Sequence, residues 1–476
     1  MEVYTPQILW HGGGSTKGKP ERVFSVDVHP KGVLATTGYD ENVPPKGCTR
    51  IWELSEGDFA AGNWAKCITQ FNDHQSDCHV ARFSPCGRWL ASASDRTIMC
   101  YEVKKPEDWL ELTDENRPRK VFLSTSLTEI YDLQWSADSR YVLAGSMNNR
   151  AQILEVATKL EHPLCGTGHT HYVQGVAWDP LNEIIATQSA DRSTKLYFLK
   201  KKPRSNKAKA GTERAAAMAS APVQEKVKFS RVATIKMIYP PTAPNDEAAT
   251  LAEADAPPVP EEKKIKKGSN LYADSTVESF FRRPAFSPDG ALFVTPTGLH
   301  KKEVTGEDGT SKSSMSFATH VFSRRKLKER NPNPTPTVTL PGLEDPSVSV
   351  SFCPRLFELV ERNGERSAPL FAGAYRMVFA VATTSTVFVY DTQHQRPIGR
   401  LGGLHCTNIN DVTWSADGTK LFCCSSDGYV SLVTFADGAL GRALSETEHE
   451  KYMVEMRRID EQDFGVNVAS GEGNAV

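Results

Sequence analysis

Few residues of this chain have the types and spacing of a reactive site. His74, Cys78 and His79 are residue types that bind zinc, but no second group of ligands at zinc-site spacing accompanies them. The glycine-rich run at residues 12–18 lacks the spacing of a phosphate-binding loop, and neither a Gly-x-Ser-x-Gly nor a His-Glu-x-x-His motif occurs. The sequence therefore predicts no catalytic activity, no bound metal and no cofactor.

The elements that would have to hold a site belong to an internal repeat. Residues 411–418, followed by 421–422 and 425–428, read as an apolar strand, a tight polar turn and a second strand. Similar tracts occupy residues 81–87, 133–138, 176–180, 285–290 and 350–354, with a weaker one at 26–32. Units of this kind that recur at roughly 40 to 60 residues are typical of β-propellers. Seven units begin near residues 23, 74, 126, 168, 280, 347 and 405, which predicts an all-β fold, a seven-bladed propeller of the WD40 type.

The predicted organisation has four parts. Residues 1–199 hold a closing strand and blades one to four, 200–274 a long disordered charged insertion between blades four and five, 275–440 blades five to seven, and 441–476 a C-terminal tail. The seventh unit has three clear strands, and residues 3–9 have strand composition. We therefore expect residues 3–9 to form the outer strand of the last blade, because that pairing leaves no open edge in the ring.

Histidine, hydroxyl and carboxylate residues recur at fixed places in the units. The WD signature, a histidine before the blade followed by Ser or Thr, Asp and Trp, is best kept in the fourth unit as His169, Thr187 and Asp191, with Tyr197 replacing the tryptophan. The first unit has the later positions of the signature but lacks the histidine. Such residues could be catalytic or could form a buried hydrogen-bond network that locks the strands of a blade, and we favour the network.

The predicted insertion is rich in Lys, Ala, Pro and Glu and is too polar to bury itself. An acidic stretch at residues 246–262 lies between two basic clusters. The clusters consist of Lys200, Lys201, Lys202 and Arg204, and of Lys263, Lys264, Lys266 and Lys267. The two clusters could simply belong to a solvated loop. Alternatively, they could act as a nuclear import signal or as a phosphate contact, and the sequence leaves these alternatives open.

The composition bounds the class of protein. The chain has 476 residues, 39% of them hydrophobic and 24% charged, with a formal net charge of −2, which is typical of a soluble globular protein. No apolar run approaches the length of a membrane span, and no signal peptide precedes the repeats. The ten cysteines follow no recurring spacing, which favours reduced thiols in an intracellular protein.

Segments outside the repeat resemble a known family. They are residues 172–176 and 178–181, 279–283, 286–290 and 295–296, 320–324, 357–359, 375–376 and 378–382, 390–393, 425–429 and 433–435. Together they resemble the mid-size WD-repeat subunit of chromatin assembly factor 1, the p60 or Cac2 family, over nearly the whole chain apart from the insertion and the tail.

The resemblance implies a nuclear histone chaperone subunit that acts without catalysis as a platform in nucleosome assembly coupled to DNA replication and repair. Its implied partners are the large subunit of chromatin assembly factor 1, the RbAp48-type WD small subunit and, mainly through the large subunit, the core histones of the central tetramer. Neither a membrane nor a specific DNA sequence is an expected partner. The alternatives are a subunit of the related HIRA/Hir family, which deposits histones independently of replication, and a nuclear corepressor or ubiquitin-ligase scaffold.

Members of the family commonly bind the anti-silencing chaperone Asf through a basic–apolar motif in a tail beyond the propeller. In this chain only the segment with Arg457, Arg458 and Ile459 partly echoes that motif. The resemblance therefore leaves this contact open.

Two short segments are candidates for partner binding. Phe280, Phe281, Arg282 and Arg283 enter blade five, and paired aromatics beside paired arginines suit an interface anchor, although the two phenylalanines could instead pack between blades. A basic loop with Arg324, Arg325 and Lys326 follows blade five as either a solvated connection or a contact. Because no long acidic run marks a histone-facing patch, we expect the chain alone to bind histones weakly.

Overall fold

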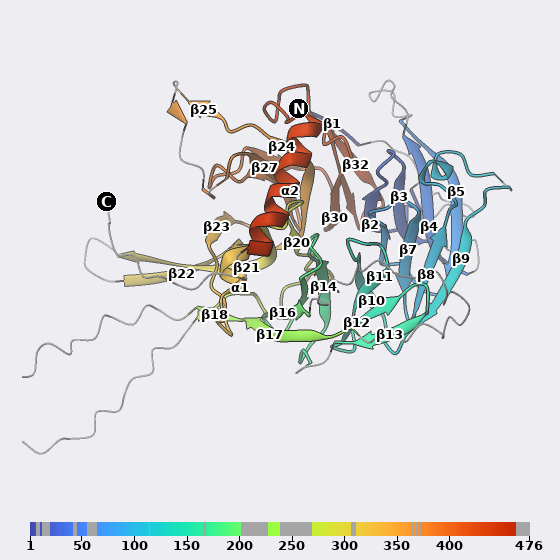
Figure 1. Ribbon diagram of the computed structural model, residues 1–476, viewed down its shortest axis with the longest axis horizontal. Helices are drawn as coiled ribbons and strands as arrows, with labels where there is room; N and C mark the ends of the chain where they lie inside the picture. The colour runs from blue at the N-terminus through green and yellow to red at the C-terminus, as the bar shows by residue number, and fades with distance from the viewer. Residues whose placement is uncertain are drawn as a thin grey trace, which may run out of the picture.

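Seven four-stranded antiparallel sheets stand around a central channel in the computed structural model, which confirms the predicted seven-bladed propeller (Figure 1). The structure describes residues 1–5, 10–11, 20–40, 45–54, 64–113, 115–164, 168–200, 227–238, 269–305, 311–362, 365–366, 370–371 and 373–462. Neither of the described α-helices combines the length and the apolarity needed to cross a membrane.

The blades follow one another along the chain. Blade one holds β2 (Val23–Val28), β3 (Leu34–Tyr39), β4 (Gly47–Leu54) and β5 (Ala65–His74), and blade two β6 (Val80–Phe83), β7 (Trp89–Ser94), β8 (Thr97–Glu102) and β9 (Arg119–Ser124). Blade three holds β10 (Ile130–Trp135), β11 (Tyr141–Ser146), β12 (Ala151–Glu155) and β13 (Leu160–Pro163). Blade four holds β14 (Val173–Trp178), β15 (Ile184–Ser189), β16 (Ser193–Leu199) and β17 (Phe229–Ile235).

The second half of the ring contains longer strands. Blade five holds β20 (Ala285–Phe286), β21 (Leu292–Thr305), β22 (Ser311–Ser323) and β23 (Val338–Leu343). Blade six holds β24 (Ser347–Phe357), β27 (Arg376–Thr383), β28 (Thr386–Asp391) and β29 (Gly399–Gly402), and blade seven β30 (Ile409–Trp414), β31 (Lys420–Ser425), β32 (Val430–Thr434) and β1 (Glu2–Tyr4). Two small two-stranded sheets lie outside the blades, β18 (Met237–Ile238) with β19 (Ser269–Asn270) and β25 (Glu361–Arg362) with β26 (Glu365–Arg366).

The core lies between neighbouring blades. Inner strands are covered on both faces, so that every residue of β27 is buried, as the apolar run at residues 377–382 predicts. Outer strands alternate between buried and exposed residues, as in β9. Each interface between blades is therefore a packed apolar layer that stabilises both of the blades it joins.

The first strand of the chain closes the ring. Glu2 pairs with Thr434 and Tyr4 with Leu432, so that β1 is the outer strand of blade seven. Of the predicted closing segment 3–9, residues 6–9 lie outside the described residues. Beyond β1 the chain re-enters the protein at Trp10 and His11, both fully buried.

The prediction that residues 200–274 form one disordered insertion is wrong, because this range contains three strands. Strand β17 lies inside this range and pairs with β16 as the outer strand of blade four. Residues 201–226, outside the described residues, therefore fall between the third and fourth strands of blade four, whereas residues 239–268 fall between blades four and five, as predicted. Only Ala233 and Ile235 of β17 are buried, so the strand carries a weak apolar signal within a polar segment.

Helix α2 (Glu446–Gln462) occupies the predicted C-terminal tail. Figure 1 shows it in red, crossing the end of blades five and six. Tyr452 of α2 packs against Tyr375 with ring centroids 5.0 Å apart, and Leu444 just before the helix is buried in the same cluster. The tail therefore begins as an element docked on the ring.

Candidate functional site

The signature residues of blade four form a strand-locking network. His169 donates from Nδ1 to Asp191 at 3.0 Å, and its Nε2 lies 2.8 Å from the Thr187 hydroxyl. Asp191 also accepts from the Thr170 amide at 3.0 Å. Burial raises the pKa of Asp191, but hydrogen bonds from His169 and Ser193 outweigh it and hold that pKa well below its usual range. Every polar group of the network is thus used to tie the blade together.

Blade one has a related network, in which His11 Nδ1 lies 3.0 Å from the Cys48 sulfur and Asp40 pairs with Arg50, so the prediction that its unit lacks the histidine is wrong. His11 places Nε2 2.9 Å from the Thr36 hydroxyl, which also accepts from Trp52 Nε1 at 2.8 Å. Burial lowers the pKa of His11 well below its usual value, so the ring is neutral. His11 precedes its threonine by 25 residues, whereas His169 precedes Thr187 by 18, and this longer gap hid the match.

His74, Cys78 and His79 do not converge on one point. His74 Nε2 lies 2.7 Å from the Ser92 hydroxyl, the Cys78 thiol donates to the Ala93 carbonyl at 3.5 Å, and His79 contacts the Ile130 carbonyl. Among the residues that the structure describes, no group of three or more His, Cys, Asp or Glu is placed to hold a metal ion.

The paired arginines of blade five lie inside the protein. Arg283 lies in the central channel. Its Nε donates to Asp132 at 3.1 Å, and its Nη1 contacts Asp411 at 3.1 Å. Its other hydrogen bonds go to the backbone carbonyls of Phe24, His79 and Asn410. One guanidinium thus joins blades one, two, three and seven.

Arg282 is buried at the junction between blades four and five. Its Nη1 donates to the Ala273 carbonyl at 2.7 Å, and burial lowers its pKa to about 10. The backbone of Arg282 lies so close to Gly175 that a Cβ on the glycine would be 1.8 Å from the Arg282 carbonyl oxygen. Position 175 therefore requires glycine.

The channel opens into a cavity of about 490 Å³ whose floor is charged. Arg82 bridges to Asp411 at 2.9 Å beside Arg283, so two guanidiniums face the carboxylates of Asp27, Asp132 and Asp411. Burial raises the pKa of Asp411, but the two arginines outweigh it and lower that pKa below its usual value. Burial dominates at Asp27 and raises its pKa to about 6.

Arg324 is also buried, contrary to the reading of residues 324–328 as a loop. It begins helix α1 (Arg324–Lys328) and contacts Asp179 at 2.9 Å and Glu183 at 2.7 Å across the junction with blade four. Lys326 is partly buried and donates to the Pro336 carbonyl at 3.4 Å, whereas Arg325 is exposed. Of this basic segment, Arg325 is the residue best placed to meet a partner.

The two predicted partner segments do not form one surface. Phe280 is 51% exposed, but Phe281 is 1% exposed and carries the Arg283 guanidinium 3.8 Å from its ring centroid. The prediction of surface contacts is therefore wrong for the four of these residues that are buried, Phe281, Arg282, Arg283 and Arg324. Phe280 lies beside Gln174 at the start of β14, whereas Arg324 lies beside Asp179 just past its end. A strand of six residues spans about 17–20 Å, so the two segments lie at opposite ends of the channel.

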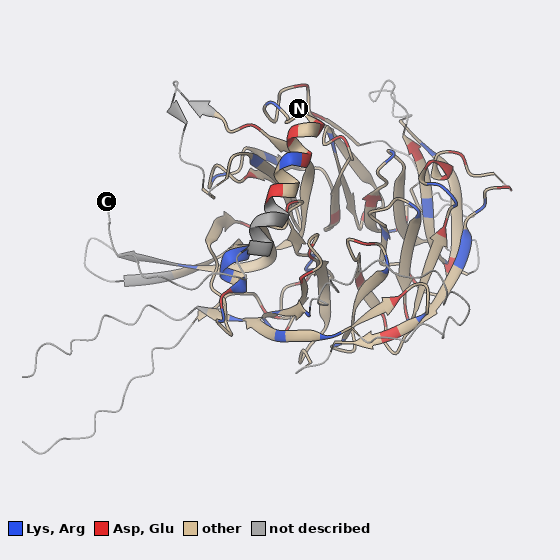
Figure 2. Ribbon diagram, viewed as in Figure 1, with Lys and Arg blue, Asp and Glu red and all other residues tan. Residues whose placement is uncertain are grey.

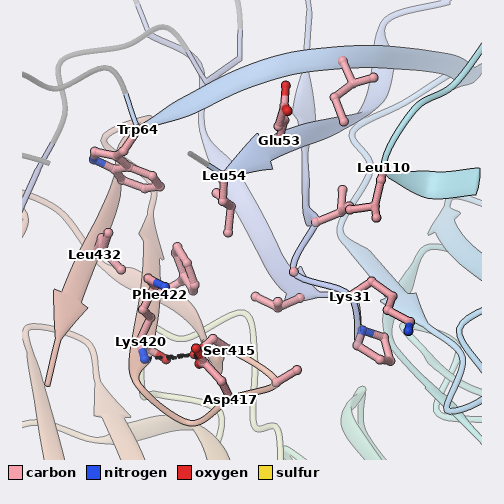
Figure 3. Close-up of a pocket in the computed structure, with 16 residues that line it drawn as sticks. Lys31, Glu53, Leu54, Trp64, Leu110, Ser415, Asp417, Lys420, Phe422 and Leu432 are labelled. Carbon is pink, nitrogen blue, oxygen red and sulfur yellow. Dashed lines mark hydrogen bonds between the residues drawn. The ribbon is translucent and has the colours of Figure 1, made fainter. Parts of the chain in front are cut away.

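A further groove of about 380 Å³ lies where blade seven meets blade one. Figure 3 shows Leu54, Trp64, Phe422 and Leu432 on one side of it. Its polar rim includes Lys31, Glu53, Asp417 and Lys420, so charges of both signs border an apolar floor.

The remaining candidates lie at the edges of the described chain. Lys200 is exposed directly after β16, the third strand of blade four. Lys201, Lys202, Arg204, Lys263, Lys264, Lys266 and Lys267 lie outside the described residues. Arg457, Arg458 and Ile459 belong to the second half of α2, so the predicted Asf segment is helical.

Comparisons with known proteins cover the whole propeller. A family model described as the CAF1B/HIR1 β-propeller domain matches residues 1–239 and 244–440. The chain is 31% identical to the B subunit of chromatin assembly factor 1 from Mus musculus, over 94% of this chain and 69% of the relative. It is 32% identical to "Chromatin assembly factor 1 subunit FAS2 homolog" of Oryza sativa subsp. japonica, over 93% of this chain and 74% of the relative. "Protein HIR1" of Aspergillus oryzae is more distant, with 24% identity over 95% of this chain and 37% of the relative.

Proposed function

Because the chain belongs to the CAF1B/HIR1 β-propeller family, we propose that it is the mid-size WD-repeat subunit of a chromatin assembly factor 1 complex, a nuclear histone chaperone. The observation that carries this proposal is the extent of the match to the relatives named for that complex. They align over 93–94% of this chain, and this chain covers 69–74% of their own length. The match to HIR1 covers 37% of that protein at lower identity, which makes the replication-independent role a weaker fit.

The proposed role is that of a non-catalytic platform. The histidine–carboxylate sets that could suggest a reactive site, such as His169 with Asp191, tie strands of one blade together. The charged groups at the channel floor are likewise paired with one another. A rigid ring presents preformed loops and rims, so a partner segment can dock without ordering the ring itself.

The proposed partners are those of a three-subunit complex. The large subunit of chromatin assembly factor 1 would bind this chain directly, and the RbAp48-type small subunit would join the same assembly. Core histones would be held mainly by the large subunit, since the carboxylates of this chain form no long run. The Asf chaperone would contact the end of α2 through Arg457, Arg458 and Ile459, and the basic clusters beginning at Lys200 would direct nuclear import.

The test is co-purification of the full chain with the large subunit. We expect a stable complex that includes the large subunit, whereas an adaptor of a ubiquitin ligase in its place would refute the proposal. The purified chain alone should hold core histones much more weakly than the complete complex does. Equal affinity would replace the platform with a direct chaperone.

Phe280 offers a separate test of the docking surface. Since an exposed aromatic is a typical interface anchor, Phe280→Ala should weaken the pulldown of the large subunit. Phe122→Ala is the matched control, since Phe122 is 50% exposed on β9 of blade two. Equal binding by both variants would exclude Phe280 as the docking site, and unchanged melting of both would show that folding is not involved.

A further inference from the structure

A basic groove of about 700 Å³ runs along the outer rim between blade four and the chain that follows α1. Its positively charged lining is Lys200, Arg231, Lys328 and Arg330, and Glu183 is its carboxylate. Its floor is formed by Phe198, Leu199, Val232 and Ala233, and Asn331 and Pro332 border it. Of these, Phe198 and Ala233 are buried, Leu199 is partly exposed and Val232 is 39% exposed, so the accessible apolar strip consists of Val232 and Leu199.

Arg231 is held in position within the basic groove. Its guanidinium stacks on Phe198 with 3.8 Å between Cζ and the ring centroid, and it donates to the carbonyls of Leu327 and Glu329, each at 2.7 Å. Burial lowers the pKa of Arg231, and the positive charge of Arg330 lowers it further. Arg231 therefore places one positive charge in the groove with its geometry already set.

The surroundings of the basic groove do not cancel this charge. Glu183 is the carboxylate that lines it, and this one group is shared between Lys328 at 2.8 Å and Arg324 at 2.7 Å. Exposed Glu329 adds one negative charge beside Arg330, whereas exposed Lys228, Lys236 and Arg325 add three positive charges near the groove. Figure 2 shows α1 as a block of Lys and Arg on the same rim. The rim therefore has an excess of positive charge that attracts anionic groups.

The basic groove also borders a sheet edge. No described strand pairs with the outer edge of β17. The Thr234 amide donates to the Pro332 carbonyl at 2.9 Å, and the Lys236 amide donates to Asn333 at 3.0 Å, so the loop covers only the end of the strand. Residues 230–233 line the groove itself. An extended peptide can lie beside such an edge, with alternate side chains pointing in opposite directions.

We infer that the basic groove binds an acidic, extended segment of a partner protein, in which carboxylates meet Lys200, Arg231 and Arg330 and apolar side chains cover Val232. A peptide provides both kinds of side chain in alternation, which matches a charged rim above an apolar strip. A nucleic acid backbone would satisfy the rim but leave the strip uncovered, so the geometry favours the peptide. The inference does not depend on which complex the chain joins.

The test uses a fluorescein-labelled peptide that alternates glutamate and leucine, titrated with the purified full chain at low salt and followed by anisotropy. The double variant Lys200→Glu/Arg330→Glu should weaken binding about tenfold, because two attractions become repulsions at a partly exposed site. Val232→Ser should weaken it by a smaller factor through the apolar strip. Added salt should weaken binding of the parent.

Matched controls make the result specific. Lys66→Glu/Lys104→Glu reverses two exposed lysines of blades one and two and should leave binding unchanged. A peptide that alternates lysine and leucine should not bind. Thermal melting of each variant checks that the ring is intact.

Three results would overturn the inference. One is equal loss of peptide binding in the control variant, which would mean that net charge alone acts. Another is a short DNA duplex binding tightly while the peptide does not, with loss of DNA binding in Lys200→Glu/Arg330→Glu. The third is peptide binding only after residues 246–262 are replaced by a neutral linker, which would make the acidic stretch of this chain the occupant.

Discussion

Closure of the ring should depend more on Trp10 than on strand β1. Trp10 is fully buried, with its ring centroid 4.6 Å from that of Trp52 and 5.6 Å from that of Trp64. Its carbonyl also accepts from Arg50 at 2.8 Å. In contrast, β1 adds a short edge strand in which Val3 is 43% exposed. Trp10 is thus a buried apolar anchor, whereas β1 contributes the backbone pairing of an edge strand.

The expected magnitudes differ accordingly. Replacing a buried tryptophan by alanine costs about 3–5 kcal/mol of unfolding free energy, because transfer and cavity terms add. Deleting residues 1–5 removes a few exposed ladder hydrogen bonds and should cost about 1–2 kcal/mol. With about 2 cal/mol/K of unfolding entropy per residue over roughly 400 residues, Trp10→Ala should lower the melting temperature by about 4–6 °C.

Differential scanning calorimetry at a fixed scan rate, together with urea unfolding, measures both variants against the parent. Size-exclusion chromatography of the deletion variant should also be run, because an uncovered β32 edge can pair with another chain. If Trp10→Ala melts within about one degree of the parent, or if the deletion costs more than the tryptophan, the anchor is not Trp10 and the reasoning fails.

Three other substitutions test the buried contacts. Gly175→Ala should cost about 3 kcal/mol or prevent soluble expression, since the new Cβ meets the Arg282 carbonyl, which cannot move freely; soluble yield and urea midpoint measure this. Arg324→Ala should cost about 3–5 kcal/mol in urea unfolding, because buried Asp179 loses its arginine and Glu183 keeps Lys328 but loses its second cation, whereas exposed Arg325→Ala should stay within about 0.5 kcal/mol. Burial raises the pKa of Asp27 to about 6, so the folded state binds a proton on this carboxyl more tightly than the unfolded state does and loses stability as pH rises from about 4 to 6. Asp27→Asn should therefore stabilise the chain at pH above about 6 and lose this advantage near pH 4, as urea unfolding at both pH values would show.

The fold could be predicted because its signals are local. Each unit carries its own polar turn between apolar strands, and the turn residues recur at a fixed distance from the strand. The network of His169, Thr187 and Asp191 was predictable for the same reason, since all of its members lie within one unit. Strand β17 was not, because only Ala233 and Ile235 are buried and the flanking residues are polar.

The burial of the arginines was hidden because its cause is distant in the sequence. Arg283 lies 151 residues from Asp132, so the carboxylate that it binds cannot be read from the sequence around it. A pair of aromatics followed by a pair of arginines therefore reads as a surface anchor until the ring is closed. His11 was missed for a related reason, because its spacing to Thr36 differs from that in blade four.

Arg283 ties four blades of the ring together, whereas the candidate binding residues lie away from it. One side chain contacts backbone or carboxylate groups of blades one, two, three and seven, so losing it would leave Asp132 and Asp411 short of a partner at the same time. The candidate contacts at Phe280 and in the basic groove lie outside this cluster, on exposed side chains of the face and the rim. Substitutions there change the surface without breaking the buried pairs, and effects of sites without shared partners usually add. Loss of binding in such variants, with melting unchanged, can therefore be assigned to the surface and not to the ring.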